Sequence, residues 1–468
     1  MADEAIALMA HLMRRAGFGA PYAELEARAK KGYEATVEEL LNPEKQPDLD
    51  EDIMLRYKTE WVNKNAIEGQ QEEWVFRMIN TKRPLEEKIA LFWHGILCTG
   101  HAKCENPRQQ NLELDMFRRD GMGRFSDLLL GLAVDPAMVF FLDNCMSHKG
   151  AINENWGREL LELFALGVGM DGKLNYSEDD VKEAARAFTG WTVVNAIPRY
   201  PYGRYLSKFV YDPKDHDNGE KTFLGETGNW NGEDIINIIV KQPAAARFVS
   251  RHLYNFFVAD EPQVPAWQHT PPQDPEAIKQ LEAEYFRSNY DIRSMLRLLF
   301  NSDFFKNARF ARVKSPVETV VGTTRMVGEF TFPQPGFNGL TLSVRYMGQD
   351  ILNPPTVEGW HTGKEWIDSG TLVERINFTA DKVGNVNLPG VRDIIARLRA
   401  EGPTLSPERL VDGCLDLLGG YKLAPETHNE LVALVQSGGE IRTGAADFPQ
   451  RAAQMLQSIV ATTEYLFA

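Results

Sequence analysis

The segment 153–167 most constrains the fold, because it predicts a helix that is apolar on most of its sides. At about 100° of rotation per residue, its polar side chains share roughly one third of the helix circumference. These polar residues are Asn155, Arg158, Glu159 and Glu162. Helices that are apolar on most sides are buried among other elements. The sequence therefore predicts a large helical assembly that encloses this polar stripe.

Carboxylates in such a stripe are costly to bury unless they are paired, protonated or bound to a cation. Glu159 and Glu162 have the i, i+3 spacing with which helical proteins build oxygen-ligand metal sites. On this interpretation they are metal ligands or acid–base groups, and Arg158 and Asn155 bind substrate. The alternative is a capped helix with a structural ion ladder from Glu154 through Arg158 to Glu162. The sequence leaves both interpretations open.

Helical patterns recur along most of the chain, from residue 5 to residue 460. One such helix is expected over 179–188, opened by a capping box at Ser177. The residues near 191–211 instead predict an irregular β-hairpin, because apolar strand-like runs flank prolines and a glycine. We therefore expect a mainly α protein, a large multi-helix domain with this one small β excursion. A boundary near 384–388 predicts a helical domain over 5–382 and a C-terminal helical subdomain over 389–468, which packs separately or as part of the same domain.

The loop 212–225 contains a second group of candidate catalytic residues. His216 and Asp217 stand beside Lys221 in a turn-rich stretch. A histidine next to an aspartate serves as a metal ligand, a general base or an orienting pair, and Lys221 would bind an anionic group. The alternative is a surface loop whose charges meet only water.

Two further segments contain candidate site residues. The Pro-, Gly- and Trp-rich stretch 347–366 offers Gln349 for polar contacts and Trp360 as a flat pocket wall, or else caps the core with its tryptophans. His94 is a candidate metal ligand in 93–104, a segment with further His and Cys residues. Four ligands along one straight helix cannot surround an ion, so a single buried His94 is the alternative.

Charge and motifs exclude several classes of protein. A net charge of -15 argues against a nucleic-acid binder, which needs a basic face, and against docking on an anionic membrane. No apolar run approaches the ~20 residues that span a bilayer, and no secretory signal is visible at the start, so a cytoplasmic location is expected. Dinucleotide, phosphate-loop, hydrolase-elbow and zincin motifs are absent.

Many short segments together resemble a large bacterial family known only as a domain of unknown function, number eighteen hundred. The resemblance covers roughly residues 5–382 in the same order. The matching segments are 11–19, 91–95, 135–138, 153–167, 180–191, His216-Asp217 with Lys221, 314–318, 347–349, 353–355 with Gly359-Trp360, and 375–378.

The resemblance implies a mainly helical fold without a securely assigned reaction. Many family members carry export signals and are encoded beside a sulfatase-like protein, which implies an envelope or exported location and a sulfatase-like partner. The present chain lacks such a signal, and it has Ile96-Leu97 where relatives often have His-Phe. The resemblance also groups the 153–166 stripe, His216-Asp217 and the Trp360 loop into one shared site.

Together these observations predict an enzyme with an enclosed carboxylate and histidine pocket, and metal-assisted hydrolysis is the reaction class expected first. The alternative is a non-catalytic binding or assembly protein that acts with a partner protein. The expected cofactor is a divalent metal. The predicted catalytic residues are Glu159, Glu162, His216 and Asp217; the predicted substrate-binding residues are Asn155, Arg158, Lys221, Gln349 and Trp360; and the predicted metal ligands are Glu159, Glu162, His94 and His216.

Overall fold

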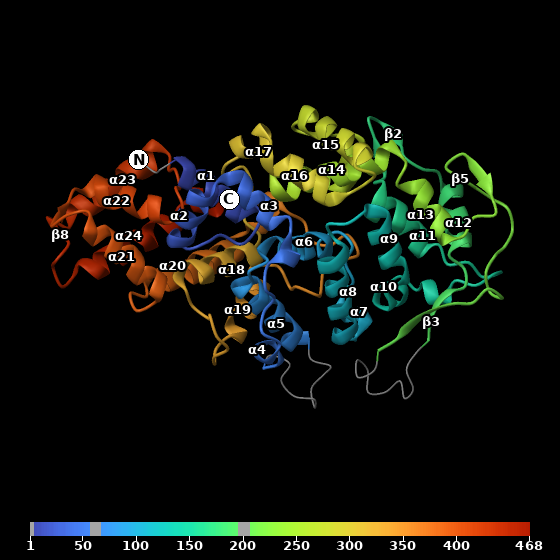
Figure 1. Ribbon diagram of the computed structural model, residues 1–468, viewed down its shortest axis with the longest axis horizontal. Helices are drawn as coiled ribbons and strands as arrows, with labels where there is room; N and C mark the ends of the chain where they lie inside the picture. The colour runs from blue at the N-terminus through green and yellow to red at the C-terminus, as the bar shows by residue number, and fades with distance from the viewer. Residues whose placement is uncertain (1–3, 57–66, 195–205) are drawn as a thin grey trace.

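The computed structural model describes residues 4–56, 67–194 and 206–468, and helices dominate these ranges (Figure 1). The helices of the first half are α1 (Glu4–Arg15), α2 (Tyr22–Lys31), α3 (Tyr33–Leu40), α4 (Glu51–Leu55), α5 (Ile67–Asn80), α6 (Pro84–His94), α7 (His101–Cys104), α8 (Pro107–Asp120), α9 (Phe125–Val134), α10 (Pro136–Phe141), α11 (Asn155–Glu159), α12 (Glu178–Ala187) and α13 (Gly232–Ile239). Those of the second half are α14 (Pro243–Phe257), α15 (Pro275–Arg287), α16 (Ile292–Asn301), α17 (Asp303–Asn307), α18 (Pro316–Val327), α19 (Asn338–Tyr346), α20 (Ser369–Gly384), α21 (Pro389–Ala400), α22 (Pro407–Leu417), α23 (Pro425–Ser437) and α24 (Phe448–Val460).

Strands form only two-stranded antiparallel pairs in the ranges that the structure describes. The pairs are β1 (Gly169–Met170) with β2 (Lys173–Leu174), β3 (Trp191–Val194) with β4 (Lys208–Tyr211), β5 (Lys221–Phe223) with β6 (Glu226–Gly228), and β7 (Thr404–Leu405) with β8 (Ile441–Arg442). The predicted hairpin is the β3–β4 pair, in which Trp191 lies opposite Tyr211. Its connecting prolines lie outside the described residues. The prediction of a mainly α protein with a small hairpin is confirmed.

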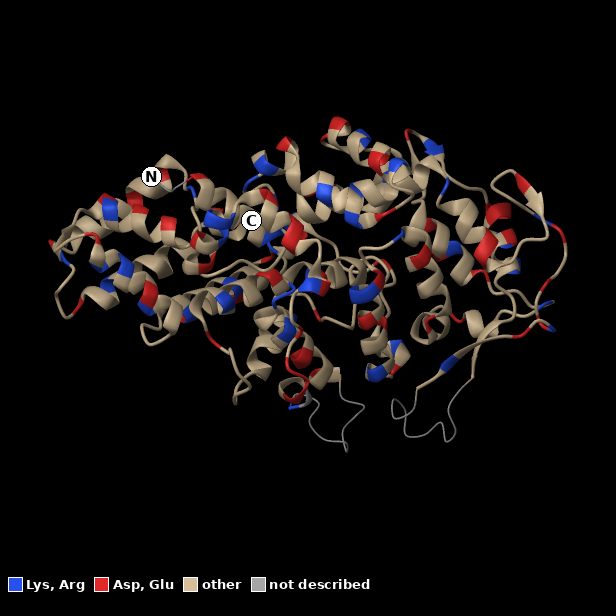
Figure 2. Ribbon diagram, viewed as in Figure 1, with Lys and Arg blue, Asp and Glu red and all other residues tan. Residues whose placement is uncertain are grey.

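The molecule is elongated in Figure 1, with α21 to α24 at one end and α11 to α13 at the other. Figure 2 shows Lys and Arg interspersed with Asp and Glu along the whole ribbon. Among the helices described, none combines the length and the apolar character that crossing a bilayer requires.

The start of α12 illustrates how local sequence sets the helix boundaries. The Ser177 hydroxyl accepts the Asp180 N–H, and the Asp180 carboxylate accepts the Ser177 N–H at 2.8 Å, so the predicted capping box is confirmed. The second Asp180 oxygen accepts the N–H of Leu224 at 2.7 Å. One cap therefore fixes both the beginning of α12 and the turn between β5 and β6.

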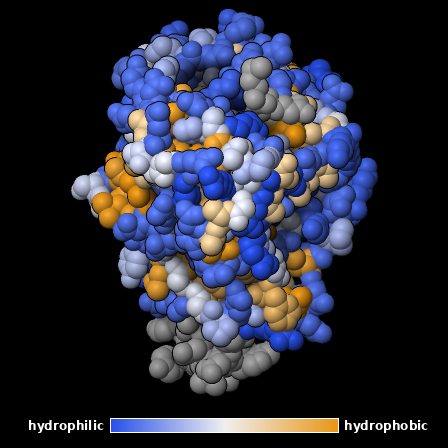
Figure 3. Space-filling view, turned by 90° about the vertical axis from the view of Figure 1, so that its left-hand side faces the viewer, coloured by the Kyte–Doolittle hydropathy of each residue, from blue (hydrophilic) through white to orange (hydrophobic). Residues whose placement is uncertain are grey.

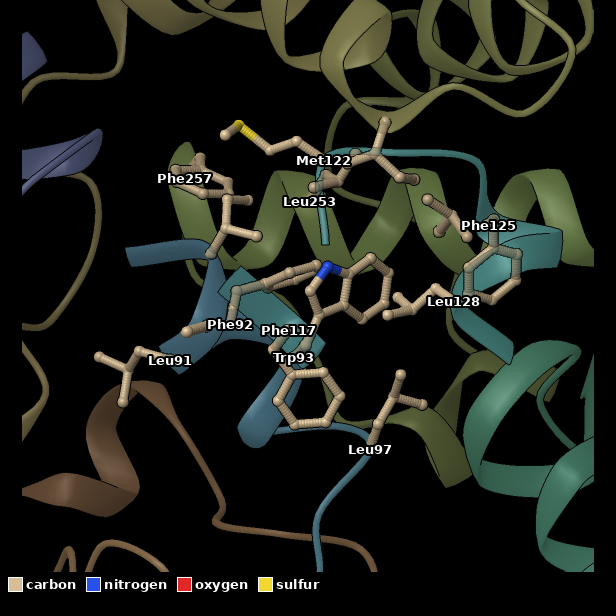
Figure 4. Close-up of a cluster of buried hydrophobic side chains, with 14 of the residues drawn as sticks. Leu91, Phe92, Trp93, Leu97, Phe117, Met122, Phe125, Leu128, Leu253 and Phe257 are labelled. Carbon is tan, nitrogen blue, oxygen red and sulfur yellow. The ribbon is translucent and has the colours of Figure 1, made fainter. Parts of the chain in front are cut away.

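The main core surrounds α6, which is buried on nearly all sides. Trp93 lies at the centre of the cluster in Figure 4, where it stacks on Phe125 with ring centroids 5.8 Å apart. Its indole N–H donates to the carbonyl of Gly121 at 2.8 Å, so the buried polar atom has a partner. This packing places the carboxyl end of α6, with His94 and Gly95, inside the molecule.

A second apolar cluster joins α21 to α24 with the end of α20. Leu398, Val411, Leu456 and Ile459 are among its fully buried members. Figure 3 faces this end of the molecule and shows a mostly hydrophilic surface with apolar side chains in small separate groups. The division of the chain into two domains at 384–388 remains a prediction, since α24 also packs along α20.

The segment 153–167 forms α11 and then one π-helical stretch, Leu160–Ala165. Its apolar residues are buried except for the half-buried Leu163, whereas Asn155 is exposed and Arg158, Glu159 and Glu162 are half-buried. The prediction of a fully enclosed stripe is therefore wrong. The stripe lies at the surface because α12 covers the opposite side of α11, where a Cβ on Gly157 would meet the Ala185 nitrogen at 2.9 Å.

Candidate functional site

The loop that carries His216 is held together by its own hydrogen bonds. The buried His216 ring donates from Nδ1 to a main-chain carbonyl 2.9 Å away. The Asp217 carboxylate accepts from Arg186 Nε at 2.8 Å, and this bond lowers the pKa of Asp217 to about 2. Lys221 is buried and donates to two carbonyls of the same loop, at 2.5 and 3.0 Å. These polar atoms are therefore used by Arg186 of α12, by the Thr189 carbonyl and by carbonyls of the loop itself, away from the pocket described below.

The polar stripe contains one carboxyl group with a strongly raised pKa. Burial raises the pKa of Glu159 to about 7, and the negative charges of Glu162 and Glu358 add to this shift. Glu162 accepts a hydrogen bond from the Tyr176 hydroxyl at 3.2 Å. Arg158 does not join them, because its guanidinium pairs with Glu178 at 2.8 Å and with Glu154. Part of the predicted ion ladder thus exists, while Glu159 lacks an ion-pair partner in the described ranges and is half protonated near neutral pH.

His94 ends α6 inside the core. Its Nε2 accepts the main-chain N–H of Leu352 at 3.0 Å, so the ring ties α6 to the Pro-rich stretch 347–366. Burial lowers the pKa of His94 to about 3, which keeps the ring neutral and able to accept. The ring also lies 5.4 Å from that of Trp360, centroid to centroid. His94 therefore positions the segment that carries Trp360.

A pocket of about 80 Å³ lies beside this contact, and we call it the Trp360 pocket. Several of its walls are aromatic and several carry polar atoms. They include Phe92, Gly95, Leu163, His252, Asn255, Phe256, Gln263, Arg312, Ser315, Gln349, Glu358, Trp360, His361, Thr362 and Trp366. The structure thus brings together two of the predicted substrate-binding residues, Gln349 and Trp360. The other predicted site residues do not line it.

Gly359 sets the position of Trp360. Its φ of +83° lies in the left-handed region, and a Cβ at this position would meet the Gly95 oxygen at 2.3 Å. Only glycine combines that backbone conformation with so close an approach. The Trp360 segment can therefore lie directly against the carboxyl end of α6, and the pocket forms at this junction.

Three polar side-chain atoms in the pocket walls are buried and have no hydrogen-bond partner among the described residues. They are His252 Nε2, Trp366 Nε1 and Arg312 Nε, the last of which lies 3.8 Å from Asp260 Oδ1 in an ion pair. The arginine and tryptophan nitrogens can only donate. Burial, together with the charge of Arg251, lowers the pKa of His252 to about 3 and keeps that ring neutral. Since buried polar groups are normally satisfied, the pocket offers donors to an acceptor that is not part of the protein.

Arg312 also belongs to a buried charge cluster. Glu318 accepts from Arg312 Nη1 at 2.8 Å, from Arg15 Nη1 at 3.3 Å and from Lys88 Nζ. All four side chains are at most 5% exposed. These cations hold the pKa of Glu318 well below its usual value, although burial alone would raise it. The cluster fixes Arg312 behind the pocket, where its guanidinium lies 5.0 Å from the Phe256 ring.

Sequence reasoning missed His252, Arg312 and Glu358 as pocket residues. His252 and Asn255 stand at i, i+3 on α14, a spacing that places both on one helix face. This spacing is the sequence feature from which both could have been predicted as neighbours in a site. Nothing local distinguishes Arg312, whose position depends on Glu318 and on residues near the start of the chain.

The predicted metal ligands are not gathered. Within residues 4–56, 67–194 and 206–468, no three His, Cys, Asp or Glu side chains are close enough to hold an ion together. The buried Cys98 and the half-buried Cys104 donate weakly to main-chain carbonyls.

Comparison with known proteins places the chain in a family without an assigned activity. No curated protein and no solved structure matches it. The family described as "Protein of unknown function (DUF1800)" matches residues 11–467, so the match extends through the C-terminal helices. The chain belongs to this DUF1800 family of proteins of unknown function.

Proposed function

We propose that the Trp360 pocket binds a small organic molecule with a flat apolar part and an acceptor group such as a carboxylate. The observation that carries the proposal is the set of buried atoms in its walls that lack a hydrogen-bond partner among the described residues. Trp366 Nε1 and Arg312 Nε are donors, and His252 Nε2 donates or accepts according to its tautomer. Trp360 and Phe92 supply apolar faces, a combination typical of small-molecule sites.

We further propose that Glu159 acts as a general acid–base beside this pocket. Leu163, one helical turn after Glu159, lines the pocket, and so does Glu358, whose charge raises the pKa of Glu159. A carboxyl group with a pKa of about 7 donates and accepts protons efficiently at neutral pH. Hydrolysis of an ester-like bond is the reaction class that this arrangement serves best. Binding without catalysis is the alternative if Glu159 transfers no proton.

Replacing Trp360 with alanine tests the binding site. Benzoate is a suitable probe, because it combines a flat ring with a carboxylate. In calorimetric titration we expect Trp360→Ala to raise the Kd of benzoate by at least about tenfold, since removal of an aromatic wall commonly costs more than ~1.4 kcal/mol. Trp230→Ala is the matched control, because Trp230 lies outside the pocket and donates to the Glu226 carbonyl. Equal Kd values for the two variants would contradict the proposal.

Replacing Glu159 with glutamine tests the acid–base role. With p-nitrophenyl esters and phosphates as substrates, we expect the pH–rate profile of the wild type to contain an ionisation near pH 7. Glu159→Gln should remove this ionisation and lower the rate by about 10²–10⁴. Glu154→Gln is the control, because Glu154 is paired with Arg158 nearer the solvent. A wild-type protein that binds benzoate and hydrolyses none of these substrates would leave binding in place and refute the hydrolytic role.

A further inference from the structure

A second pocket, which we call the Arg14 pocket, lies where α1 and α18 meet the C-terminal helices. Its volume is about 60 Å³, roughly twice the ~30 Å³ that one water occupies in the liquid. The residues used below are Arg14, Lys314, Tyr421 and Tyr465. It is separate from the Trp360 pocket, with which it shares no lining residue.

Two cations line the Arg14 pocket. The guanidinium of Arg14 lies 4.9 Å from the Phe310 ring and 5.0 Å from the Tyr421 ring, and these two rings also contact each other, with centroids 5.0 Å apart. Lys314 is 7% exposed, and its Nζ donates to the Tyr465 carbonyl at 2.5 Å. Both side chains are therefore oriented by their neighbours before any ligand arrives.

Neither cation has a carboxylate partner. Within the described parts of the chain, no acidic group lies within 4.0 Å of Arg14 or Lys314. Arg14 donates from Nη1 to the Gly419 carbonyl at 3.0 Å, but its buried Nε and Nη2 have no partner there. These two nitrogens form the edge of the guanidinium that binds oxyanions with two parallel hydrogen bonds.

The carboxylate of Glu318 does not neutralise the two cations. Glu318 lines the pocket, but its oxygens already accept from Arg15, Lys88 and Arg312. The guanidinium of Arg375 adds positive charge beside Lys314. Its Nη1 donates to the Lys314 carbonyl at 2.8 Å, and its Nε and Nη2 lack hydrogen-bond partners among the described residues. Burial, together with the positive charges of Arg14 and Arg375, lowers the pKa of Lys314. An anion bound between Arg14 and Lys314 would neutralise this excess of positive charge.

We propose that the Arg14 pocket binds one small oxyanion of the size of phosphate, held by Arg14 Nε and Nη2 on one side and by Lys314 Nζ on the other. The oxyanion is either inorganic phosphate or the phosphate group of a monoester that reaches in from outside. In both cases it joins α1 to the C-terminal region, because Tyr421 lies between α22 and α23 and Tyr465 follows α24.

Calorimetric titration of the full chain with inorganic phosphate, at constant ionic strength, tests the proposal. We expect saturable one-site binding in the wild type. Arg14→Met and Lys314→Met should each weaken it by at least about tenfold, since hydrogen bonds to charged groups are worth at least that much. Arg397→Met is the matched control. Arg397 lies outside the Arg14 pocket, stacks on Tyr22 and pairs with Asp393 and Glu26.

A phosphoserine titration and two measurements on the wild type extend this test. Phosphoserine as a second titrant distinguishes the two sources, because tighter binding than that of inorganic phosphate indicates a monoester ligand. If either variant does not fold, phosphate-dependent thermal stabilisation and ³¹P line broadening of the wild type decide the matter. Absence of saturable phosphate binding to the wild type, or equal binding by wild type, Arg14→Met and Lys314→Met, would overturn the proposal.

Discussion

Glu318→Gln is expected to destabilise the protein by about 3–5 kcal/mol, because it leaves three cations buried without their shared carboxylate. Arg15, Lys88 and Arg312 all donate to Glu318, and none of these side chains is more than 2% exposed. Urea denaturation at pH 7.5 measures the effect. The surface pair of Arg158 and Glu178 supplies the control, since Glu178→Gln should leave the free energy of unfolding nearly unchanged.

The stabilisation that Glu318 provides depends on pH. The pKa of Glu318 lies well below 4.5 in the folded chain, so its stabilising contribution is present above its usual pKa. That contribution is lost as the pH falls through the lowered folded pKa. The stability difference between wild type and Glu318→Gln should therefore be largest near neutral pH and shrink in acid. A loss below about 1 kcal/mol at pH 7.5 would contradict the assigned role of the cluster.

Gly359→Ala is expected to have the largest effect on the Trp360 pocket. The substitution forces alanine into a φ of +83°, which costs about 1–3 kcal/mol, and places Cβ 2.3 Å from the Gly95 oxygen. Because backbone lies on both sides of this contact, the Trp360 segment must move away from α6. We expect a lower Tm and loss of measurable benzoate binding in the same calorimetric titration.

Gly336→Ala separates the two causes. Gly336 has a φ of +91°, but a Cβ there would meet no atom within 4 Å. This control therefore carries the backbone strain without the collision, and should retain benzoate binding. If the two alanine variants lose the same stability and bind benzoate equally, the close approach to Gly95 has no role in forming the pocket.

Local patterns were sufficient to predict the fold class. The capping box at Ser177 and the strand-like residues at 191–194 and 208–211 act over a few positions, and the structure shows both. The π-helical stretch Leu160–Ala165 was not predicted, because its hydrogen bonds shift by one residue without any change in residue type. Half-burial of Glu159 was likewise missed, since it depends on which side of α11 meets α12.

The site was harder to predict, because its residues are brought together by distant partners. Gln349 and Trp360 were named from their own loop, and both line the pocket. His216 and Lys221 looked like site residues for their chemistry, yet their polar atoms bind the adjacent backbone. Residue type alone does not distinguish a side chain that satisfies its own loop from one that stays available to a ligand. His252 illustrates the second case.

The ion cluster at Glu318 has a consequence for the timing of folding. Arg15 and Glu318 are 303 residues apart in the chain. At a synthesis rate of ~5–20 residues per second, the first helix leaves the ribosome about 15–60 s before its carboxylate partner exists. During that interval α1 exposes an unpaired arginine beside an apolar face. Assembly of the centre of this protein must therefore wait until translation is well past its midpoint, and nascent chains need protection from aggregation until then.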